Sequence, residues 1–133
     1  MSCNPYETIK ADVIGVETES STIKTVSLSV EKPFEFRTGQ FVQFAVENVG
    51  EAPFTPSSSP FEKERFDVTI MNVGRVTDFI HSLKKGIQVG IRGPFGNGYP
   101  VDDFKGKEVL ILGVGVGLAP LRSLLLTLIA RKD

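Results

Sequence analysis

The sequence is poor in the residues that most often build metal centres and cross-links. Its single cysteine, Cys3, excludes an internal disulfide bond and a cysteine-rich zinc or iron–sulfur site. Its single histidine, His81, falls beside Ile80 on a predicted helix, which favours a surface or boundary residue over a base or ligand. No G-x-S-x-G elbow and no Ser–His–carboxylate order occurs. We therefore expect no metal site and no catalytic triad.

Three further absences limit the partners and the location of the protein. Fifteen Lys and Arg oppose sixteen Asp and Glu, and a formal charge of −1 provides no basic surface for non-specific nucleic-acid binding. The N-terminus has no basic region followed by an apolar stretch, so no signal peptide is visible. The longest apolar tract, residues 124–130, is interrupted by Thr127 and is too short to span a bilayer. We expect a cytoplasmic protein without nucleic-acid or membrane partners.

What remains is an ordinary globular composition with an uneven distribution of glycine. The 133 residues are 41% hydrophobic and 23% charged, which suits one domain with a real core. Alternating apolar and polar residues predict short strands, and strands this short, joined by turns, indicate a sandwich or small barrel. The predicted strands are residues 11–17, 25–30, 41–46, 66–70 and 87–92. Nine of the thirteen glycines lie between Gly86 and Gly117, so backbone freedom is concentrated there.

Two helices are predicted. The first carries one apolar stripe with helical spacing, made by Val76, Phe79, Ile80 and Leu83. Thr77 is its expected N-cap and Gly86 its expected C′ residue. The second follows Gly113 and tolerates Pro120 in its first turn. Its expected apolar stripe is Leu121, Leu124, Leu125, Leu128 and Ile129.

The last part of the chain has a different pattern of apolar and polar residues. Residues 109–112 are continuously apolar, as in a parallel strand that is buried on both faces. They lead into a glycine turn and the second helix, which is how an α/β domain begins. No second parallel strand follows, and no strand precedes Asp133, so we give that carboxylate no ribose-binding role. We expect residues 107–133 to pack on the barrel, to self-associate or to be poorly ordered.

Two segments have the residues of a phosphate-binding turn. Residues 113–120 place glycines between a predicted strand and a helix N-terminus, where backbone N–H groups can approach a phosphate. The spacing departs from G-x-G-x-x-G because Leu118 occupies the last glycine position, and a tight connection built for packing is an equal alternative. Residues 72–77 combine Gly74, Arg75 and Thr77 before a helix. Taken alone, an ordinary capped helix with a solvated arginine is the better interpretation of that segment.

Two more segments are rich in turn-forming residues. In residues 52–60, three prolines could hold four hydroxyls and Phe54 in a rigid loop or edge strand, with Phe54 as a stacking face for a flat ring. A Ser/Pro-rich surface loop is the more common explanation of such a composition. In residues 93–100, the Asn97-Gly98 pair is a strong turn signal, and a glycine-rich hairpin is favoured.

In this order, the four segments resemble the ferredoxin–NADP reductase superfamily, in which a flavin-binding barrel precedes a nicotinamide-nucleotide domain. The resemblance is carried by G-E-A-P-F-T-P-S-S-S-P at residues 50–60, V-G-R-V-T at 73–77, G-P-F-G-N-G at 93–98 and G-x-G-x-G-L-A-P at 113–120. Within that superfamily, the flavin subunits of cytoplasmic sulfhydrogenases and anaerobic sulfite reductases are the most similar group. Electron-transfer subunits of dihydroorotate dehydrogenase are more distant.

The resemblance implies a mainly β fold: an antiparallel Greek-key FAD-binding barrel with one helix, over residues 1–105. Residues 106–133 are then the first strand–helix unit of an incomplete α/β nucleotide-binding domain. The position of Thr55 implies a contact near flavin N5, and no side chain acts as a catalytic acid or base. The implied FAD-binding residues are Pro53, Phe54, Thr55, Ser57, Ser58, Gly74, Arg75, Val76 and Thr77. The implied start of the nucleotide site is Gly113, Gly115, Gly117, Ala119 and Pro120.

The same resemblance implies a function and some departures. The expected function is flavin-mediated electron transfer between a nicotinamide nucleotide, NAD(P)H in the full-length protein, and an iron–sulfur, hydrogenase or sulfite-reductase type subunit. Many members carry arginine where this chain has Ala52, and a glycine where it has Val114. We expect this chain to be part of a larger flavoenzyme. The alternative is a non-catalytic barrel that binds a partner subunit and binds flavin weakly or not at all; an oligonucleotide-binding barrel is disfavoured by the charge.

Overall fold

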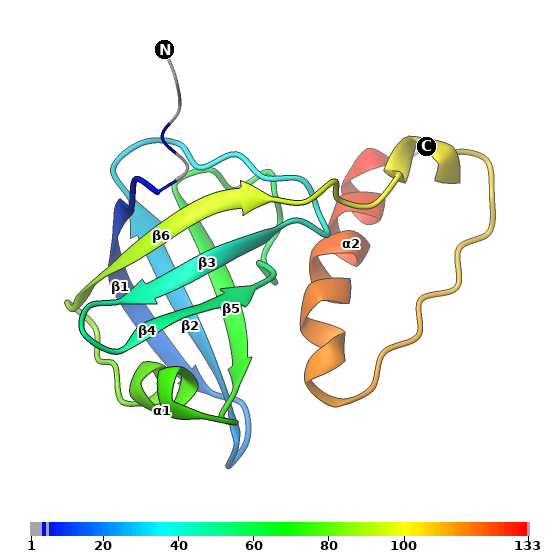
Figure 1. The fold of residues 1–133 in the computed structure, drawn as a ribbon. Helices are drawn as coiled ribbons and strands as arrows, with labels where there is room; N and C mark the ends of the chain where they lie inside the picture. Colours follow the sequence, from blue (N-terminus) through cyan, green and yellow to red (C-terminus); the bar gives the residue numbers. More distant parts are fainter. Residues whose placement is uncertain (1–3, 5, 133) are drawn as a thin grey trace.

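Six antiparallel strands form a barrel, as the computed structural model shows for residue 4 and residues 6–132 (Figure 1). Their order in the sheet is β4-β3-β6-β1-β2-β5, so β6 is inserted between β1 and β3 in the Greek-key manner. The strands are β1 (Ile9–Thr18), β2 (Ile23–Val30), β3 (Phe41–Val46), β4 (Gly50–Phe54), β5 (Arg65–Met71) and β6 (Gln88–Phe95). The predicted antiparallel barrel is confirmed. Cys3 and Asp133 lie outside the described residues.

The sheet closes on itself at one end only. A single bridge pairs Pro56, just beyond β4, with Val68 on β5. Next to it, the Ser57 N–H donates to the Asp67 carbonyl oxygen at 2.8 Å. The rest of β4 is paired with β3 alone. The barrel therefore has one open seam, between β4 and β5.

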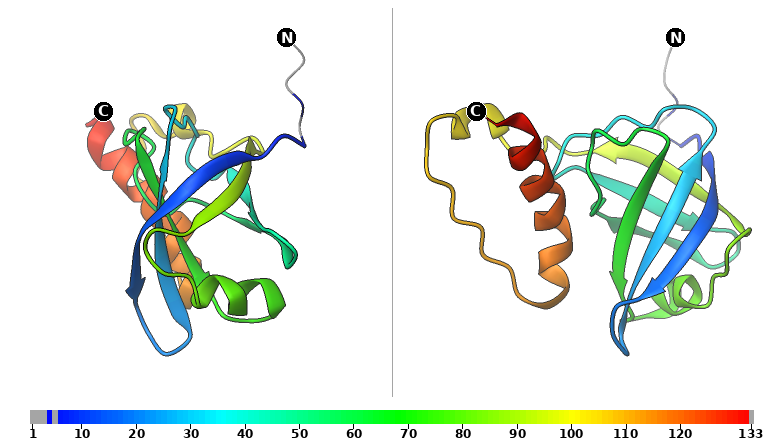
Figure 2. Two further views of the ribbon diagram at one scale, coloured as in Figure 1. Left: turned by 90° about the vertical axis from the view of Figure 1, so that its left-hand side faces the viewer. Right: turned by 180° about the vertical axis from the view of Figure 1, so that it is seen from behind.

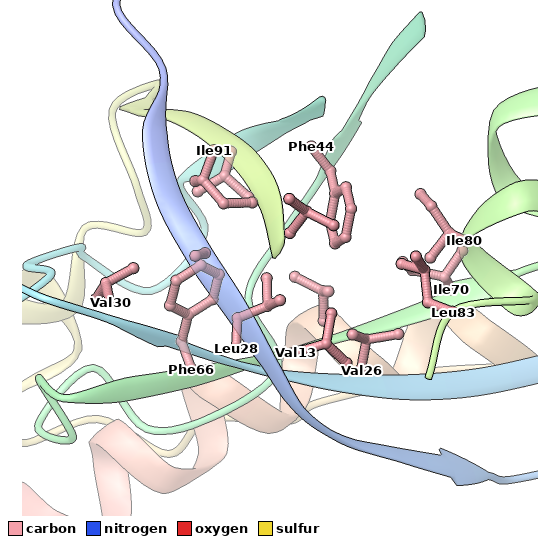
Figure 3. Close-up of a cluster of buried hydrophobic side chains, with 14 of the residues drawn as sticks. Val13, Val26, Leu28, Val30, Phe44, Phe66, Ile70, Ile80, Leu83 and Ile91 are labelled. Atoms are coloured by element: carbon pink, nitrogen blue, oxygen red, sulfur yellow. The ribbon is translucent and has the colours of Figure 1, made fainter. Parts of the chain in front are cut away.

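The core fills the barrel interior with the side chains that the alternating pattern points inward. Figure 3 shows Leu28, Phe44, Phe66 and Ile91 meeting there from four strands, and each is essentially inaccessible to solvent. Phe66 also stacks on Phe34 with ring centroids 4.8 Å apart. Four of the ten phenylalanines, Phe34, Phe36, Phe44 and Phe66, are buried in this core, whereas Phe61 and Phe79 are exposed.

Helix α1 (Arg75–His81) covers one end of the barrel (Figures 1 and 2). Ile80 is fully buried and Leu83 nearly so, which confirms the inner part of the predicted stripe, although Phe79 is 41% exposed. Two boundary predictions are wrong. Gly74, not Thr77, is the N-cap, since the chain turns helical three residues earlier than the side-chain pattern shows. The helix ends at His81 with Ser82 as C-cap, so Gly86 belongs to the following turn.

The single histidine has a structural role at the end of α1. The Nε2 atom of His81 donates to the Ile70 carbonyl oxygen at 2.8 Å. Lys24 Nζ donates to the His81 carbonyl oxygen at 2.9 Å, which satisfies a free carbonyl at the helix C-terminus. His81 is thus the boundary residue that the sequence predicts.

After β6 the chain does not form the predicted hairpin. Residues 96–100 run instead as an irregular loop into the 3₁₀ helix η1 (Val101–Phe104). The amide of Gln40 pins this loop, because its Nε2 donates to the Gly96 carbonyl oxygen at 2.8 Å. Tyr99 N–H donates to the Thr38 carbonyl oxygen at 2.8 Å. These two contacts satisfy backbone groups of the loop with residues 38–40, so a second hairpin strand is not required to satisfy them.

The segment after η1 differs most from the sequence expectation. Residues 109–112 are extended but form no strand, and Leu110 and Leu112 are 82% and 78% exposed. A parallel strand is stable only beside other strands, and among the described residues nothing pairs with this one. Figures 1 and 2 show the segment running clear of the barrel, outside helix α2.

Helix α2 (Leu118–Arg131) packs on the barrel, one of the three outcomes expected for this region. It does so through Ser123, Leu124 and Thr127, which are its buried residues. The predicted leucine stripe is only partly buried: Leu124 is inside, Leu121 and Leu128 are partly buried, and Leu125 and Ile129 are 47% and 62% exposed. In the part of the chain that the structure describes, no helix is long and apolar enough to cross a bilayer.

Candidate functional site

The open seam of the barrel presents the free edge of β4. From Gly50 to Phe54 this strand pairs only with β3, so its outer N–H and C=O groups have no strand partner. An unpaired edge can accept hydrogen bonds from, and donate them to, a flat polar ligand. Pro53, which is exposed, contributes no N–H donor to that edge. The sequence had left loop and edge strand as alternatives for this segment, and the edge strand is what forms.

Phe54 and Thr55 lie at the end of this edge. The Phe54 ring meets Phe44 edge-on, with centroids 6.3 Å apart and planes at 87°, so the core fixes its position. Phe54 is nevertheless only partly buried, which leaves ring surface accessible. The Thr55 hydroxyl is partly exposed and has no hydrogen-bond partner among the described residues. A fixed aromatic ring and an available hydroxyl therefore stand side by side in the sequence at the seam.

Ser57 and Ser58 face the barrel wall. They are 2% and 3% exposed. The Ser57 hydroxyl is 3.1 Å from Thr69 Oγ1 and 3.3 Å from the Asp67 carbonyl oxygen, and the Ser58 hydroxyl accepts from Asp67 N–H at 2.9 Å. Both hydroxyls are engaged with β5, so they close the barrel. The Ser57 N–H and carbonyl oxygen are also engaged, with Asp67 and Arg122, which leaves the backbone of Ser58 for a ligand.

The loop before α1 is held in shape by the hydroxyl of Thr77. Val73 N–H and Gly74 N–H both donate to Thr77 Oγ1 at 2.9 Å, and that hydroxyl lies 2.9 Å from the Gly74 carbonyl oxygen, to which it donates. Thr77 is buried, so it shapes the loop rather than reaching outward. Arg75 is exposed and has no partner among the described residues, and the space beside Gly74 is open. The loop thus presents a free cation and an accessible backbone.

The two halves of the seam are joined at the start of β4. Val76 packs against Gly50, where a Cβ atom would lie 3.2 Å from Val76 Cγ2. Phe54 is four residues further along the strand, about 13 Å away at the usual strand rise. The seam therefore offers an aromatic ring and a hydroxyl at one end and a cation at the other, which suits an elongated ligand with a flat head and an anionic middle.

The second glycine segment lies beside β2 and β5. Gly115, with φ of +58°, opens the short 3₁₀ helix η2 (Gly115–Gly117), and Ala119 and Pro120 stand in the first turn of α2. Gly113 is the close approach: a Cβ there would lie 2.9 Å from Leu121 Cδ1. A cavity of about 420 Å³ separates this turn and α2 from Ile23 and Thr69 on the barrel.

Sequence reasoning missed two features near the site. Arg122 Nη1 donates to the Ser57 carbonyl oxygen at 2.9 Å, which links α2 to the segment after β4. A larger cavity, about 1020 Å³, lies between the loops at residues 35–40, 60–63 and 97–103 and the C-terminal end of α2. Neither has a local signal, because each depends on residues far apart in the chain. At the rim of the larger cavity, the hydrogen bond and charge of Lys63 lower the pKa of the Glu35 carboxyl.

Comparison with known proteins agrees with this geometry. The family model described as an oxidoreductase FAD-binding domain matches residues 10–99. Sulfhydrogenase 1 subunit gamma of Pyrococcus furiosus is 41% identical over 92% of this chain, which spans 44% of that relative. The ferredoxin–NAD(P)(+) reductase component of the naphthalene 1,2-dioxygenase system of Pseudomonas putida is 31% identical over 91% of the chain and 37% of the relative.

Solved structures show the same fold. The crystal structure of the Amycolatopsis cytochrome P450 reductase GcoB superposes with a TM-score of 0.84 at 27% identity, over 94% of this chain and 40% of that one. A ferredoxin reductase of carbazole 1,9a-dioxygenase gives 0.83 at 22% identity, over 98% of this chain and 41% of the other, which bears on the fold alone. The chain spans less than half the length of these relatives.

Proposed function

This chain belongs to the oxidoreductase FAD-binding domain family, and we propose that it holds FAD along the open seam between β4 and β5 for electron transfer. Its barrel is that of flavin oxidoreductases of the ferredoxin–NADP reductase type, and FAD is the cofactor of that family. When bound, the flavin supplies the redox chemistry by accepting a hydride and releasing single electrons. The protein residues bind and orient it.

The observation that carries the proposal is the free edge of β4, with different chemistry at its two ends. At the far end, the exposed surface of the Phe54 ring covers one face of the isoalloxazine. The Thr55 hydroxyl, which has no hydrogen-bond partner in the described part of the chain, donates or accepts at the flavin N5 edge. Pro53 keeps the strand extended between them. Ser57 and Ser58 continue the same wall, with the backbone of Ser58 available to the ligand.

At the near end, the loop before α1 receives the diphosphate. Gly74 leaves room for phosphate oxygens, and Arg75 provides the positive charge that neutralises them. Val76 packs this loop against β4, and Thr77 fixes its shape through the hydrogen bonds of its hydroxyl. Because Ala52 lacks the charge that many family members have at its position, Arg75 carries the electrostatic role.

The proposal extends to the remainder of the chain and to a longer protein. Residues 1–105 are the FAD-binding barrel, and residues 106–133 begin a nucleotide-binding domain. Gly113, Gly115, Gly117, Ala119 and Pro120 then form the first turn of an NAD(P)H site. The sulfhydrogenase relative is named as a subunit, which supports a partner redox subunit of the hydrogenase, sulfite-reductase or iron–sulfur type. A cytoplasmic location is part of the same proposal.

Flavin content tests the proposal directly. The purified chain is mixed with FAD, free flavin is removed, and the flavin absorbance is compared with the protein concentration. We expect a yellow protein with close to one FAD per chain. A colourless preparation that ignores added FAD would refute the flavin role and leave the non-catalytic, partner-binding barrel as the better description.

A further inference from the structure

Arg122 makes a long-range contact with the segment that follows β4. Its Nη1 donates to the Ser57 carbonyl oxygen at 2.9 Å, and the two residues are 65 positions apart in the sequence. A hydrogen bond from a guanidinium group is charge-assisted and stronger than one between neutral groups. Arg122 lies near the N-terminal end of α2, five residues after Gly117, the last residue of η2. The contact therefore joins the proposed nucleotide-binding segment, residues 106–133, to the proposed FAD-binding barrel, residues 1–105.

The barrel holds Ser57 from the opposite side. Its N–H donates to the Asp67 carbonyl oxygen at 2.8 Å, and its hydroxyl lies 3.1 Å from Thr69 Oγ1. Thr69 in turn meets Thr25 at 2.9 Å, and Thr25 donates to Glu19 Oε1 at 2.7 Å. A chain of hydroxyl groups thus ties Ser57 to β5 and β2, while Arg122 ties it to α2. Ser57 is clamped between two layers.

The clamp lies two residues from the candidate flavin contacts. Pro56, which separates Ser57 from Thr55, is fully buried and has a restricted φ, so a displacement of the Ser57 peptide is transmitted to Thr55. We propose that Arg122 is a positioning residue, which holds the Ser57 carbonyl and thereby sets the place of the Thr55 hydroxyl at the flavin. The inference rests on the proposed FAD site at the β4–β5 seam.

This role makes α2 part of the flavin site. A group that binds at the glycine turn and displaces α2 also displaces the Ser57 peptide through Arg122. Coupling free energies are reciprocal, so flavin binding favours the position of α2 that completes the clamp. Arg122 is then the contact that couples flavin binding at the seam to ligand binding at the glycine turn.

The test compares Arg122→Gln with Arg131→Gln in the full chain. Arg131 is the matched control, since it lies on the same helix but pairs with Asp102 at 2.7 Å, away from Ser57. FAD affinity is measured by fluorescence titration, and the visible absorption bands of bound FAD report the surroundings of the ring. We expect Arg122→Gln to weaken FAD binding about tenfold and to shift the bands, Arg122→Lys to recover part of both, and Arg131→Gln to stay within about twofold of the wild type.

Thr69→Val tests the same clamp from the barrel side. It removes the partner of the Ser57 hydroxyl and keeps the side-chain shape, so it should shift the absorption bands in the same direction as Arg122→Gln. It keeps the test possible if Arg122→Gln does not fold. Unchanged bands and affinity in Arg122→Gln or Thr69→Val would overturn the positioning role, as would an equal effect of Arg131→Gln. A wild-type chain that takes up no FAD removes the proposed function itself, a result distinct from a failure of the clamp.

Discussion

The loop before α1 offers a sharp test, because one hydroxyl holds it. Thr77→Val keeps the shape of the side chain but removes the oxygen that accepts from Val73 N–H and Gly74 N–H, both at 2.9 Å. It also removes the donor to the Gly74 carbonyl oxygen. Valine fits the buried site, so the expected loss comes from hydrogen bonding rather than from a cavity.

The expected loss of unfolding free energy depends on the surroundings of the backbone groups that lose their hydrogen bonds. Loss of a helix-start hydrogen bond costs about 1 kcal/mol, and a further neutral hydrogen bond contributes about 1 kcal/mol. Val73 and Gly74 are exposed, so water replaces part of what the hydroxyl supplied. We expect the free energy of unfolding to fall by about 1–2 kcal/mol, which corresponds to a melting temperature lower by roughly 4–8 °C.

Urea unfolding of the flavin-free chain, followed by circular dichroism, measures this effect; the chain has no tryptophan to report on it. Thr22→Val is the control, since Thr22 is exposed and its hydroxyl has no partner among the described residues. Its expected change is below about 0.5 kcal/mol. Equal unfolding free energies for the two variants would show that the Thr77 hydroxyl does not hold the loop.

Three further predictions address the seam and the larger cavity. Arg75→Gln should weaken FAD binding about fivefold, because it removes one exposed charged contact, and should leave the binding of riboflavin, which has no phosphate, unaffected. Arg65→Gln is the matched control. Equal losses of affinity for FAD and riboflavin would contradict a diphosphate role. Phe54→Ala should weaken both flavins about fivefold through lost ring contact, whereas Phe54→Tyr should keep the affinity, as titration will show. Because Lys63 lowers the pKa of Glu35, their pair stabilises the folded chain above the unfolded pKa of that carboxyl and loses its effect as the pH falls through the lowered folded value. Lys63→Met should return the pKa of Glu35 toward its ordinary value in an NMR titration, and an unmoved pKa would exclude Lys63 as the cause.

The strands were readable from the sequence because their signal is local. In β2, β3 and β5, every second residue is apolar and buried, so the two-residue period alone identifies the inward face. The apolar stripe of α1 is equally local. The family was readable for the same reason, because the motifs at 50–60, 73–77 and 93–98 are short segments of adjacent residues, and the family model matches residues 10–99.

Element ends and exposed faces were less predictable. Thr77 has the chemistry of an N-cap, but the cap is set by backbone torsion, and Gly74 adopts the extended conformation that begins α1. The apolar run at residues 109–112 has the composition of a buried strand, yet strand formation requires neighbours that the described chain does not supply. In α2, the leucine stripe is the expected buried face, but Ser123 and Thr127 are buried beside Leu124, while Leu125 and Ile129 stay exposed.

By itself, the sequence determined the barrel, the place of α1 and the family, because periodicity, turn chemistry and motif order are properties of neighbouring residues. Only the tertiary structure decided which hydroxyls are free. Within residues 4 and 6–132, the Thr55 hydroxyl is left without a partner, whereas those of Ser57, Ser58 and Thr77 are engaged. It also brought Arg122 to Ser57 across 65 positions. Such contacts depend on how distant segments pack, and no local pattern records them.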